Sequence, residues 1–539
     1  MRSSKEVVEV EGFKRRIPES LKKARTKWVL LLSPPFKKLE YRKYRLGENL
    51  GMRYLASFLE THRHRVDILE PSLDGSSIEK TAKKILRNDY DLIGLSVPHG
   101  GLFPNMVKVV RILRNNGFEG HITAGGHFPT FEHKEILRYN RNIDSIVRHE
   151  GEHTLLELVA RLDSGSFENI LGLSYRTKDS ITINPHRPLI KDLDGLPFPK
   201  RDKYSEYDEL NHFAMITSRG CYGNCSFCSV RAFYSYDRPL WRYRTPENII
   251  KEIEYLVETY DAQVISFVDD NFIGPGEFGR KRALKIAHKI AERGIEIFFE
   301  ISCKPDSVDE KIFKNLKEAG LRHVSIGVES GIEDILKRFN KGLTVSKNVS
   351  AIQTMRDLSL SFTPYFIMFD PCTCIEELKE NVQFLYDNNI CTYFTIRNAI
   401  SIYRGTPLYS QVERVLKRKN WEYFYKFGDS DVTKVYRIIN SLGELITLDS
   451  ILEVLVYIAD VENDMLDRDT AVNVLEEITK KINKYVYDTV LNIIDRVSSS
   501  SEDDLKCHIE YFQKDVHTFI EYIRKVMSKN ELSHVFQMA

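Results

Sequence analysis

The chain of 539 residues has a formal net charge of +1, and 29% of its side chains are charged. This length allows about three domains, and the balanced charge excludes a bulk preference for nucleic acid or for an anionic membrane. No run reaches the ~20 apolar residues that cross a bilayer, and residues 1–27 lack the apolar core of a signal peptide. Because the eight cysteines show no disulfide framework, we expect a cytoplasmic protein with a solvated leader over residues 1–27.

Residues 28–184 alternate short apolar runs with segments of helical period. The apolar runs predict buried strands at residues 29–32, 65–70, 91–97, 121–124 and 144–147. Five such repeats predict an α/β fold with a doubly wound, flavodoxin-like parallel sheet, in which ligands bind beyond the carboxyl ends of the strands. Residues 171–176 and 181–184 predict a small hairpin, and the proline-containing residues 185–205 predict a linker.

Residues 206–410 repeat the rhythm of strand and helix. Strands are predicted at residues 213–217, 264–268, 295–301, 323–328, 362–369 and 392–396. Six repeats predict a partial TIM-like (β/α)6 barrel, whose functional residues should follow the carboxyl ends of the strands. Beyond residue 410 the rhythm stops, and residues 411–539 predict an all-α substrate or lid domain.

Cys221, Cys225 and Cys228 follow the first strand of this second unit with the spacing C-x₃-C-x₂-C. Iron–sulfur clusters normally take four thiolates, so three thiolates on one loop predict a 4Fe-4S cluster with one iron open to an outside ligand. A structural zinc knuckle is the alternative. Zinc usually takes a fourth Cys or His at a paired spacing, and no such partner is evident nearby.

The cysteine loop, with an aromatic residue before its third cysteine, resembles that of the radical S-adenosylmethionine (SAM) enzymes. This resemblance implies that SAM binds the open iron and is cleaved after one-electron reduction by an external donor such as flavodoxin or ferredoxin. It also implies a set of SAM-binding residues: Phe227 at the adenine, Asp269 and Asp270 at the methionine moiety, Gly327 and Glu329 at the ribose, and Lys341 at the carboxylate. Surface acids at 269 and 270 and a helix C-cap at 340–342 are the alternatives.

The loops after the strands of residues 28–184 resemble those of the cobalamin-binding domain of cobalamin-dependent radical SAM proteins. Glycines there let a backbone approach a flat macrocycle without obstruction by a Cβ. The implied cobalamin-binding residues are Ser33, Pro34, Ser96, His99, Gly125, Gly126, His127, Glu150 and Gly151. A response-regulator-like or flavin-binding sheet of the same topology is the alternative.

The chain also departs from both patterns. It contains no Asp-x-His-x-x-Gly segment, which many cobalamin domains use to ligate cobalt, so His99 is placed near the cobalt from topology alone. A histidine that only makes hydrogen bonds is the alternative there. Residues 303–306 and 368–374 replace two motifs common among relatives, and these changes put the fine contacts to SAM in doubt.

Together the two resemblances imply a class B-like radical SAM methyltransferase. Such an enzyme methylates an unactivated carbon of a small-molecule or peptide substrate through methylcobalamin and a 5′-deoxyadenosyl radical. A cobalamin-dependent radical cyclase or ring-rearranging enzyme, a cobalamin sensor with a vestigial barrel and a tRNA-modifying enzyme are the alternatives. No basic RNA-binding module is recognisable, so we expect no nucleic-acid partner.

Overall fold

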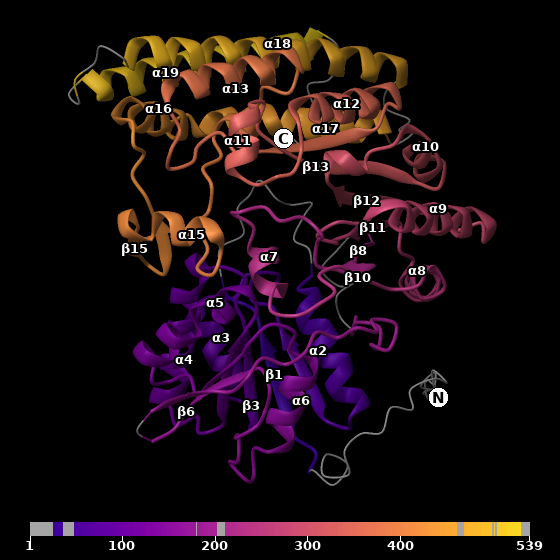
Figure 1. The fold of residues 1–539 in the computed structure, drawn as a ribbon, viewed down its shortest axis with the longest axis vertical. Helices are drawn as coiled ribbons and strands as arrows, with labels where there is room; N and C mark the ends of the chain where they lie inside the picture. Colours follow the sequence, from indigo (N-terminus) through magenta and orange to yellow (C-terminus); the bar gives the residue numbers. More distant parts are fainter. Residues whose placement is uncertain are drawn as a thin grey trace. The chain divides into compact units, whose positions relative to one another are not determined.

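A computed structural model describes residues 25–35, 48–178, 180–201, 211–460, 468–497, 501 and 504–529 (Figure 1). The chain divides into two compact units. The first unit comprises Met1–Lys38, Asn49–Tyr207 and Arg242–Arg244, and the second comprises Leu39–Glu48, Asp208–Trp241 and Thr245–Ala539. The predicted leader lies outside the described residues except for residues 25–27. The predicted barrel and the C-terminal helices fall largely in the second unit, so the boundary near residue 410 stays a prediction.

The first unit is built on a seven-stranded sheet of order β2-β1-β3-β4-β5-β6-β7. Its parallel strands are β1 (Trp28–Leu32), β2 (Arg65–Leu69), β3 (Leu92–Ser96), β4 (His121–Gly125) and β5 (Ser145–Val147). The strands alternate with helices α2 (Leu50–Thr61), α3 (Ile78–Ile85), α4 (Phe103–Asn115), α5 (His127–Tyr139) and α6 (Glu152–Ala160). This topology confirms the predicted doubly wound sheet, and its order reverses between β1 and β3, where ligands of such sheets bind.

The strands of the first sheet are apolar because helices cover both faces of a parallel sheet. In β1, Val29, Leu31 and Leu32 are at most 2% exposed. The predicted hairpin forms as β6 (Leu173–Arg176) and β7 (Ile181–Ile183), but it is not separate from the sheet. Instead, β6 pairs antiparallel with β5 and extends it.

The second unit contains a five-stranded parallel sheet of order β14-β13-β12-β11-β8. Its strands are β8 (His212–Met215), β11 (Val264–Phe267), β12 (Phe298–Cys303), β13 (Leu321–Glu329) and β14 (Ser361–Phe366). The intervening helices are α8 (Pro246–Tyr260), α9 (Gly276–Glu292), α10 (Glu310–Glu318), α11 (Glu333–Arg338), α12 (Val345–Asp357) and α13 (Ile375–Asp387). Thr245 caps α8 by accepting from the Asn248 N–H, with proline at the first helical position.

The strand predicted at residues 392–396 is wrong, because these residues form the short helix α14 (Tyr393–Ile396). The Asp449 carboxylate accepts hydrogen bonds from the N–H groups of Tyr393 and Phe394, which caps a helix start and overrides local strand preference. In place of a sixth strand, the described residues beyond β14 form one isolated parallel β-bridge, between Phe369 and Ala399. The partial-barrel fold class is unaffected.

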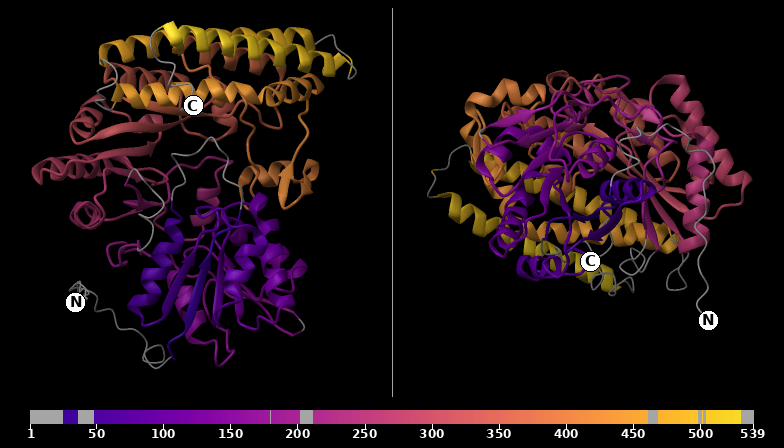
Figure 2. Two further views of the ribbon diagram at one scale, coloured as in Figure 1. Left: turned by 180° about the vertical axis from the view of Figure 1, so that it is seen from behind. Right: turned by 90° about the horizontal axis from the view of Figure 1, so that it is seen from below.

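The C-terminal segment is helical, as predicted, in α16 (Ser430–Ser441), α17 (Ile446–Asp460), α18 (Arg468–Val497) and α19 (Asp504–Lys529). The long helices α17, α18 and α19 run side by side (Figures 1 and 2). Ile478, Ile482, Val486 and Val490 form the buried stripe of α18 at helical spacing. A small hairpin, β15 (Lys417–Lys419) with β16 (Glu422–Phe424), is an addition that the sequence did not indicate. In the described part of the chain no helix has the length and apolarity to span a bilayer.

Candidate active site

The cysteine loop leaves the sheet directly after β8. Gly220 opens it with a φ of +82°, and a Cβ there would lie 1.9 Å from the Leu240 carbonyl oxygen, so this position requires glycine. A Cβ at Gly223 would lie 3.4 Å from Cys221 Sγ and 3.9 Å from Cys225 Sγ, so both thiols face the same glycine. The loop therefore brings two of its three sulfurs to one glycine, with the Lys304 side chain 3.8 Å from the same Cβ position.

The surroundings of the three thiols disfavour their charged form. Burial raises the pKa of the Cys221 and Cys225 thiols, and that of Cys228 to about 12. Bound iron is what holds such sulfurs as thiolates. Among the described residues, no three His, Cys, Asp or Glu side chains lie close enough to hold a single metal ion. Three cysteines on one short loop are the kind of ligand that iron–sulfur clusters take, so the residues present fit a 4Fe-4S cluster.

Backbone hydrogen bonds fix the far end of the loop. Ser226 donates from its N–H to the Phe339 carbonyl at 2.8 Å and from its hydroxyl to the Arg338 carbonyl at 3.2 Å. The Ser226 carbonyl accepts from the Leu408 N–H at 2.9 Å. One serine thus joins the cysteine loop to the end of α11 and to α15 (Pro407–Val412).

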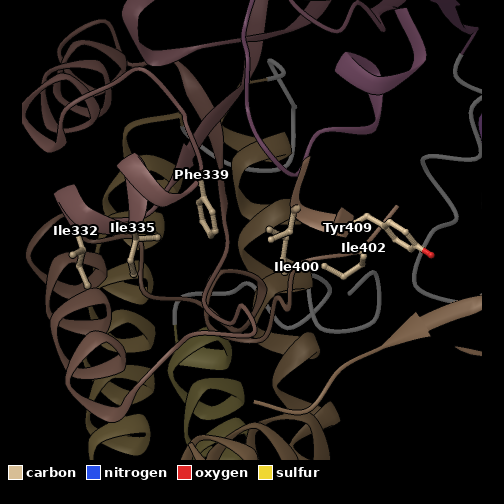
Figure 3. Close-up of a cluster of buried hydrophobic side chains, with 7 residues drawn as sticks. Ile332, Ile335, Phe339, Ile400, Ile402 and Tyr409 are labelled. Atoms are coloured by element: carbon tan, nitrogen blue, oxygen red, sulfur yellow. The ribbon is translucent and has the colours of Figure 1, made fainter. Parts of the chain in front are cut away.

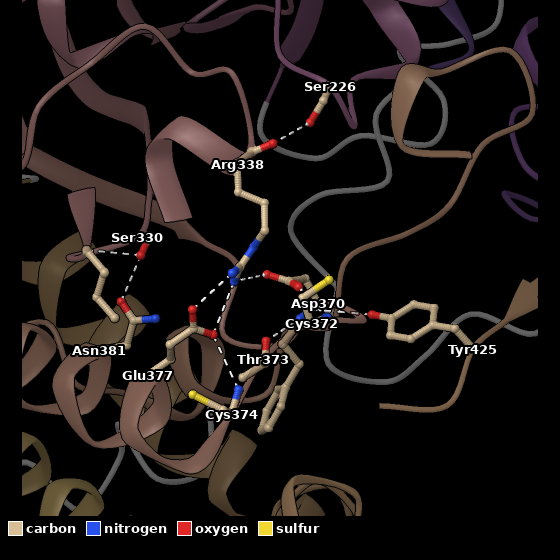
Figure 4. Close-up of polar contacts among 12 residues, drawn as sticks. Ser226, Ser330, Arg338, Asp370, Cys372, Thr373, Cys374, Glu377, Asn381 and Tyr425 are labelled. Carbon is tan, nitrogen blue, oxygen red and sulfur yellow. Dashed lines mark hydrogen bonds and ion pairs between the residues drawn. The ribbon is translucent and has the colours of Figure 1, made fainter. Parts of the chain in front are cut away.

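Arg338 extends this anchor to the loop after β14 (Figure 4). Its guanidinium contacts Asp370 Oδ2 at 2.7 Å and Glu377 Oε1 at 2.9 Å. Glu377 also accepts from the Cys374 N–H at 3.3 Å. The residues that depart from the common motif at 368–374 are therefore tied to the same turn that holds the cysteine loop, a role for Arg338 that sequence reasoning missed.

Phe227 packs against an apolar cluster, whose buried members are drawn in Figure 3. Its ring lies 5.3 Å from that of Phe339, in an edge-to-face arrangement. The buried members of the cluster are Ile332, Ile335, Phe339, Ile400, Ile402, Leu408 and Tyr409. This packing holds Phe227 half-buried beside the thiols, and its contact with adenine stays a prediction.

Gly327, Glu329 and Lys341 come together beside Cys225. Lys341 Nζ lies 2.6 Å from Glu329 Oε1, and a Cβ on Gly327 would lie 2.8 Å from both atoms. Burial opposes the charge on Lys341, but Glu329 and then the Cys225 thiol raise its pKa above the ordinary value. Glu329 has a φ of +63°, an uncommon backbone conformation for a residue other than glycine.

Asp269 and Asp270 hold the start of the cysteine loop. The buried Asp269 carboxylate accepts from the Thr217 N–H at 3.0 Å and from the Ser218 hydroxyl at 2.5 Å. Asp270 Oδ2 accepts from the Gly220 N–H at 3.0 Å. Both residues therefore position the loop, and their contact with SAM stays a prediction.

A second lysine that sequence reasoning did not select lies beside the loop. Lys304 follows β12, with its Nζ 3.3 Å from Asp306 Oδ2 and 4.9 Å from the centre of the Tyr222 ring. It acts against burial by lowering the pKa of the Cys221 and Cys225 thiols. The departure from the common motif at residues 303–306 was the one sequence feature that pointed to this position. A lone lysine after a strand does not by itself indicate a functional residue.

In the first unit, the strand ends form a second candidate site. The Ser33 hydroxyl after β1 is buried and has no hydrogen-bond partner within the described ranges. Gly126 has a φ of +103°, and a Cβ there would lie 3.1 Å from the Val97 carbonyl oxygen, while one at Gly125 would lie 3.3 Å from the Val147 carbonyl oxygen. The orphaned Ser33 hydroxyl fits a ligand such as cobalamin, whereas both glycine Cβ positions face protein backbone and are explained by local packing. The buried Pro34 follows Ser33 on the same loop.

The remaining cobalamin candidates differ in their surroundings. Ser96 accepts from the Asn49 side-chain amide at 3.0 Å. His99 is exposed, whereas His127 begins α5 and burial lowers its pKa to about 4. The roles of these residues in cobalamin binding stay predictions.

Glu150 and Gly151 occupy the turn before α6. The Glu150 carboxylate accepts from Arg242 Nη1 at 2.8 and 2.9 Å and from the Ile190 N–H at 2.8 Å. A Cβ on Gly151 would lie 3.1 Å from the Leu55 side chain. The local packing already uses both residues, so their predicted contact with cobalamin gains no support from this geometry.

Comparison with known protein families identifies two domains in the chain. A model of the radical SAM superfamily matches residues 215–385, and a model of the B12 binding domain matches residues 44–159. An uncharacterized methyltransferase of Pyrococcus horikoshii is 31% identical over 403 residues, which cover 73% of this chain and 85% of that protein. An anaerobic magnesium-protoporphyrin IX monomethyl ester cyclase of Rubrivivax gelatinosus is 27% identical, over 62% of this chain and 61% of its own length.

A solved structure shares the fold of nearly the whole chain. The cobalamin-dependent SAM radical enzyme OxsB, with aqua-cobalamin and SAM bound, superimposes with a TM-score of 0.72 over 95% of this chain and 83% of its own, at 19% identity. The cofactors that these domains imply are a 4Fe-4S cluster, SAM and cobalamin, the three predicted from the sequence. With both domain types in one chain and a relative matched over most of its length, the protein belongs to the cobalamin-dependent radical SAM enzymes.

Proposed function

We propose that this enzyme transfers a methyl group to an unactivated carbon of a small-molecule or peptide substrate. The observation that carries the proposal is the cysteine loop beside the Glu329–Lys341 pair, in a chain that also contains a B12 binding domain. The relative from Pyrococcus horikoshii, named a methyltransferase, supports it. When bound, SAM at the cluster supplies hydrogen-atom abstraction and cobalamin supplies the methyl group.

In this proposal the protein binds and orients its cofactors. Cys221, Cys225 and Cys228 hold three irons. Lys341 donates to the SAM carboxylate in a charge-assisted hydrogen bond, and Glu329 accepts from the ribose hydroxyls. Lys341 and Glu329 pair with each other in the structure. On binding, the SAM carboxylate would replace Glu329 as the acceptor for Lys341, and the ribose hydroxyls would replace Lys341 as donors to Glu329.

The first unit would hold cobalamin at its strand ends. The orphaned Ser33 hydroxyl offers one hydrogen bond, and Gly125 and Gly126 are the proposed points of close backbone approach to the ligand. Pro34, Ser96, His99 and His127 complete this proposed set. We also propose a flavodoxin- or ferredoxin-like electron donor and a cytoplasmic location, because a reducing compartment preserves the free thiols.

A second function is a ring closure without methyl transfer. The cyclase of Rubrivivax gelatinosus, which matches over 62% of this chain, favours it as the alternative. Both reactions consume SAM at the cluster, but methyl transfer uses a second SAM and leaves S-adenosylhomocysteine.

The test is anaerobic turnover of enzyme reconstituted with iron, sulfide and hydroxocobalamin, using SAM with a deuterated methyl group. We expect 5′-deoxyadenosine, S-adenosylhomocysteine and a product that has gained the labelled methyl. Deoxyadenosine and a changed substrate without S-adenosylhomocysteine would instead identify the cyclase. Changing all three loop cysteines to alanine should abolish deoxyadenosine release while the cobalamin absorption spectrum is retained.

A further inference from the structure

A small basic hairpin packs against the apolar cluster that holds Phe227. Its strands β15 and β16 are joined by Asn420 and Trp421. Both of these residues have a positive φ, +49° and +69°, as in the two-residue turns of tight hairpins. The Arg418 guanidinium lies 4.1 Å from the centre of the Trp421 ring. A turn of this kind fixes the register of the two strands, so the hairpin presents its side chains in a set order.

The inner face of the hairpin contacts the apolar cluster. The Tyr423 ring lies 5.2 Å from that of Tyr409, a buried member of the cluster. The Tyr423 hydroxyl also accepts from the Arg404 guanidinium at 2.9 and 3.1 Å. Leu416, directly before β15, packs against the same cluster. Because Tyr423 pairs with Arg418 across the hairpin, these two residues mark its inner face.

The same cluster reaches the cysteine loop in two ways. Phe227, between the second and third cysteines, packs against the cluster and lies 5.3 Å from the Phe339 ring. Leu408, next to Tyr409, donates from its N–H to the Ser226 carbonyl at 2.9 Å. One ring contact and one hydrogen bond therefore lead from the hairpin to the cysteine loop, within the second unit alone.

The opposite face of the hairpin is exposed. Lys417 pairs with Phe424, and Lys419 pairs with Glu422. Successive residues of a strand point to opposite faces, so these four residues share the face that points away from Tyr423. We call it the outer face. All four residues are exposed, and Phe424 retains 49% of its accessible surface.

The charge of this segment is not balanced. Residues 414–426 contain five basic side chains and one acidic side chain, in a chain whose net charge is +1. Within the described ranges, the side chains of four of the basic residues make no hydrogen bond or ion pair, namely Arg414, Lys417, Lys419 and Lys426. By contrast, Lys480 in the lysine-rich part of α18 pairs with Glu476. The charge of the hairpin therefore remains available to a partner.

An exposed ring among positive charges suits a transient protein partner. Electron-transfer complexes are small, burying less than ~1,200 Å², and complementary charges speed their formation. A basic surface attracts an acidic partner in this way. Nucleic acid and anionic membranes also attract positive charge, but neither explains why the hairpin packs on the side chains that surround the cysteine loop.

We propose that the outer face is the docking surface for the electron donor, and that the donor is a small acidic redox protein. This inference rests on the flavodoxin- or ferredoxin-like donor of the proposed function. Lys417 and Lys419 attract the donor, and Phe424 supplies the apolar contact at the centre of the surface. The docked donor gives up one electron to the cluster held by the three loop cysteines, and no atom or proton changes place.

The experiment uses the holoenzyme reconstituted with iron, sulfide and hydroxocobalamin, with flavodoxin and ferredoxin as acidic donors. Isothermal titration calorimetry measures donor binding. Release of 5′-deoxyadenosine from SAM is measured with each reduced donor and, separately, with dithionite. We expect the double variant Lys417→Glu, Lys419→Glu to weaken donor binding and to slow donor-driven release by on the order of tenfold or more at low salt. Dithionite needs no docking surface, so it should drive native and variant enzymes at the same rate.

Salt and two further variants separate charge from packing. Added salt should weaken donor binding to the native enzyme more than to the double variant, because salt screens exposed charges. Phe424→Ser should weaken donor binding and leave its salt dependence unchanged. Lys480→Glu is the matched control, because it reverses the charge of an exposed lysine of the same unit that already pairs with Glu476, and donor binding should not change.

The outcomes are distinguishable. Unchanged donor-driven release in the double variant would overturn the inference, and a loss of affinity for anionic phospholipid vesicles in that case would assign the hairpin to a membrane. An equal loss with dithionite would also overturn it, since the hairpin would then only support the fold. If native enzyme responds to dithionite but to neither acidic protein, the inference fails while SAM cleavage stands. No release with any reductant would contradict the proposed function itself.

Discussion

Replacing Lys341 by methionine tests the centre of the proposed SAM site. In the structure its Nζ lies 2.6 Å from Glu329 Oε1, and the two side chains are 6% and 11% exposed. Coulomb attraction at this distance is about 6 kcal/mol at an effective dielectric constant of about 20. Much of that value offsets the cost of desolvating both charges. Removing one member of a buried pair nonetheless costs about 3–5 kcal/mol, because the other charge stays buried alone.

Lys341→Met should therefore have two separable effects. The second unit should unfold at lower temperature, because Glu329 loses its partner. The affinity for SAM should fall by about 10- to 150-fold, the value of a hydrogen bond to a charged group. Adding Glu329→Gln should recover much of the stability, since no buried charge is then left, but it should not recover the affinity.

Equilibrium dialysis of radiolabelled SAM against the holoenzyme measures the affinity, and thermal unfolding measures the stability. Lys337→Met is the matched control, because Lys337 is 75% exposed and pairs with the exposed Asp334. SAM binding within threefold of the native value in Lys341→Met would refute the assignment of this lysine to the SAM carboxylate. Restored binding in the double variant would show that the lysine acts only on stability.

Three further predictions concern the loops and the barrel end. Gly220→Ala should lower the iron bound after reconstitution to less than half, because the new Cβ meets the Leu240 carbonyl at 1.9 Å, and Gly443→Ala, where no atom lies within 4 Å, should not. Gly126→Ala should weaken cobalamin binding, measured by absorbance titration, with the iron content unchanged, since a φ of +103° costs a side chain about 1–3 kcal/mol. Burial raises the pKa of Asp449 to about 7, so its contribution to stability is complete below about pH 3.8 and is lost as the pH rises through 7. The free energy of unfolding in urea of Asp449→Asn, relative to that of the native protein, should therefore rise by up to ~1.4 kcal/mol per pH unit between pH 5 and 7. A difference between the two proteins that does not change with pH would refute this.

The sequence predicted most of the fold, because strands and helices of an α/β chain carry local periodicity. It also predicted the cysteine loop, whose spacing is local. What it missed depends on partners far along the chain. Arg338 acts through Asp370 and Glu377, which are 32 and 39 residues away. The wrong strand at residues 392–396 has the same cause, because the capping carboxylate that makes it helical lies more than 50 residues downstream.

In the proposed site, one turn of the chain would position both the cluster and SAM. Ser226, between the second and third cysteines, hydrogen-bonds to Arg338 and Phe339, and Lys341 follows two residues later. Arg338 in turn is held by the carboxylates of Asp370 and Glu377. The same turn therefore holds the cysteine loop and sets the position of Lys341. Because this turn contacts both the cysteine loop and Lys341, we expect a change that loosens it to weaken both the cluster and SAM binding, whereas loss of a thiol alone should leave the lysine in place.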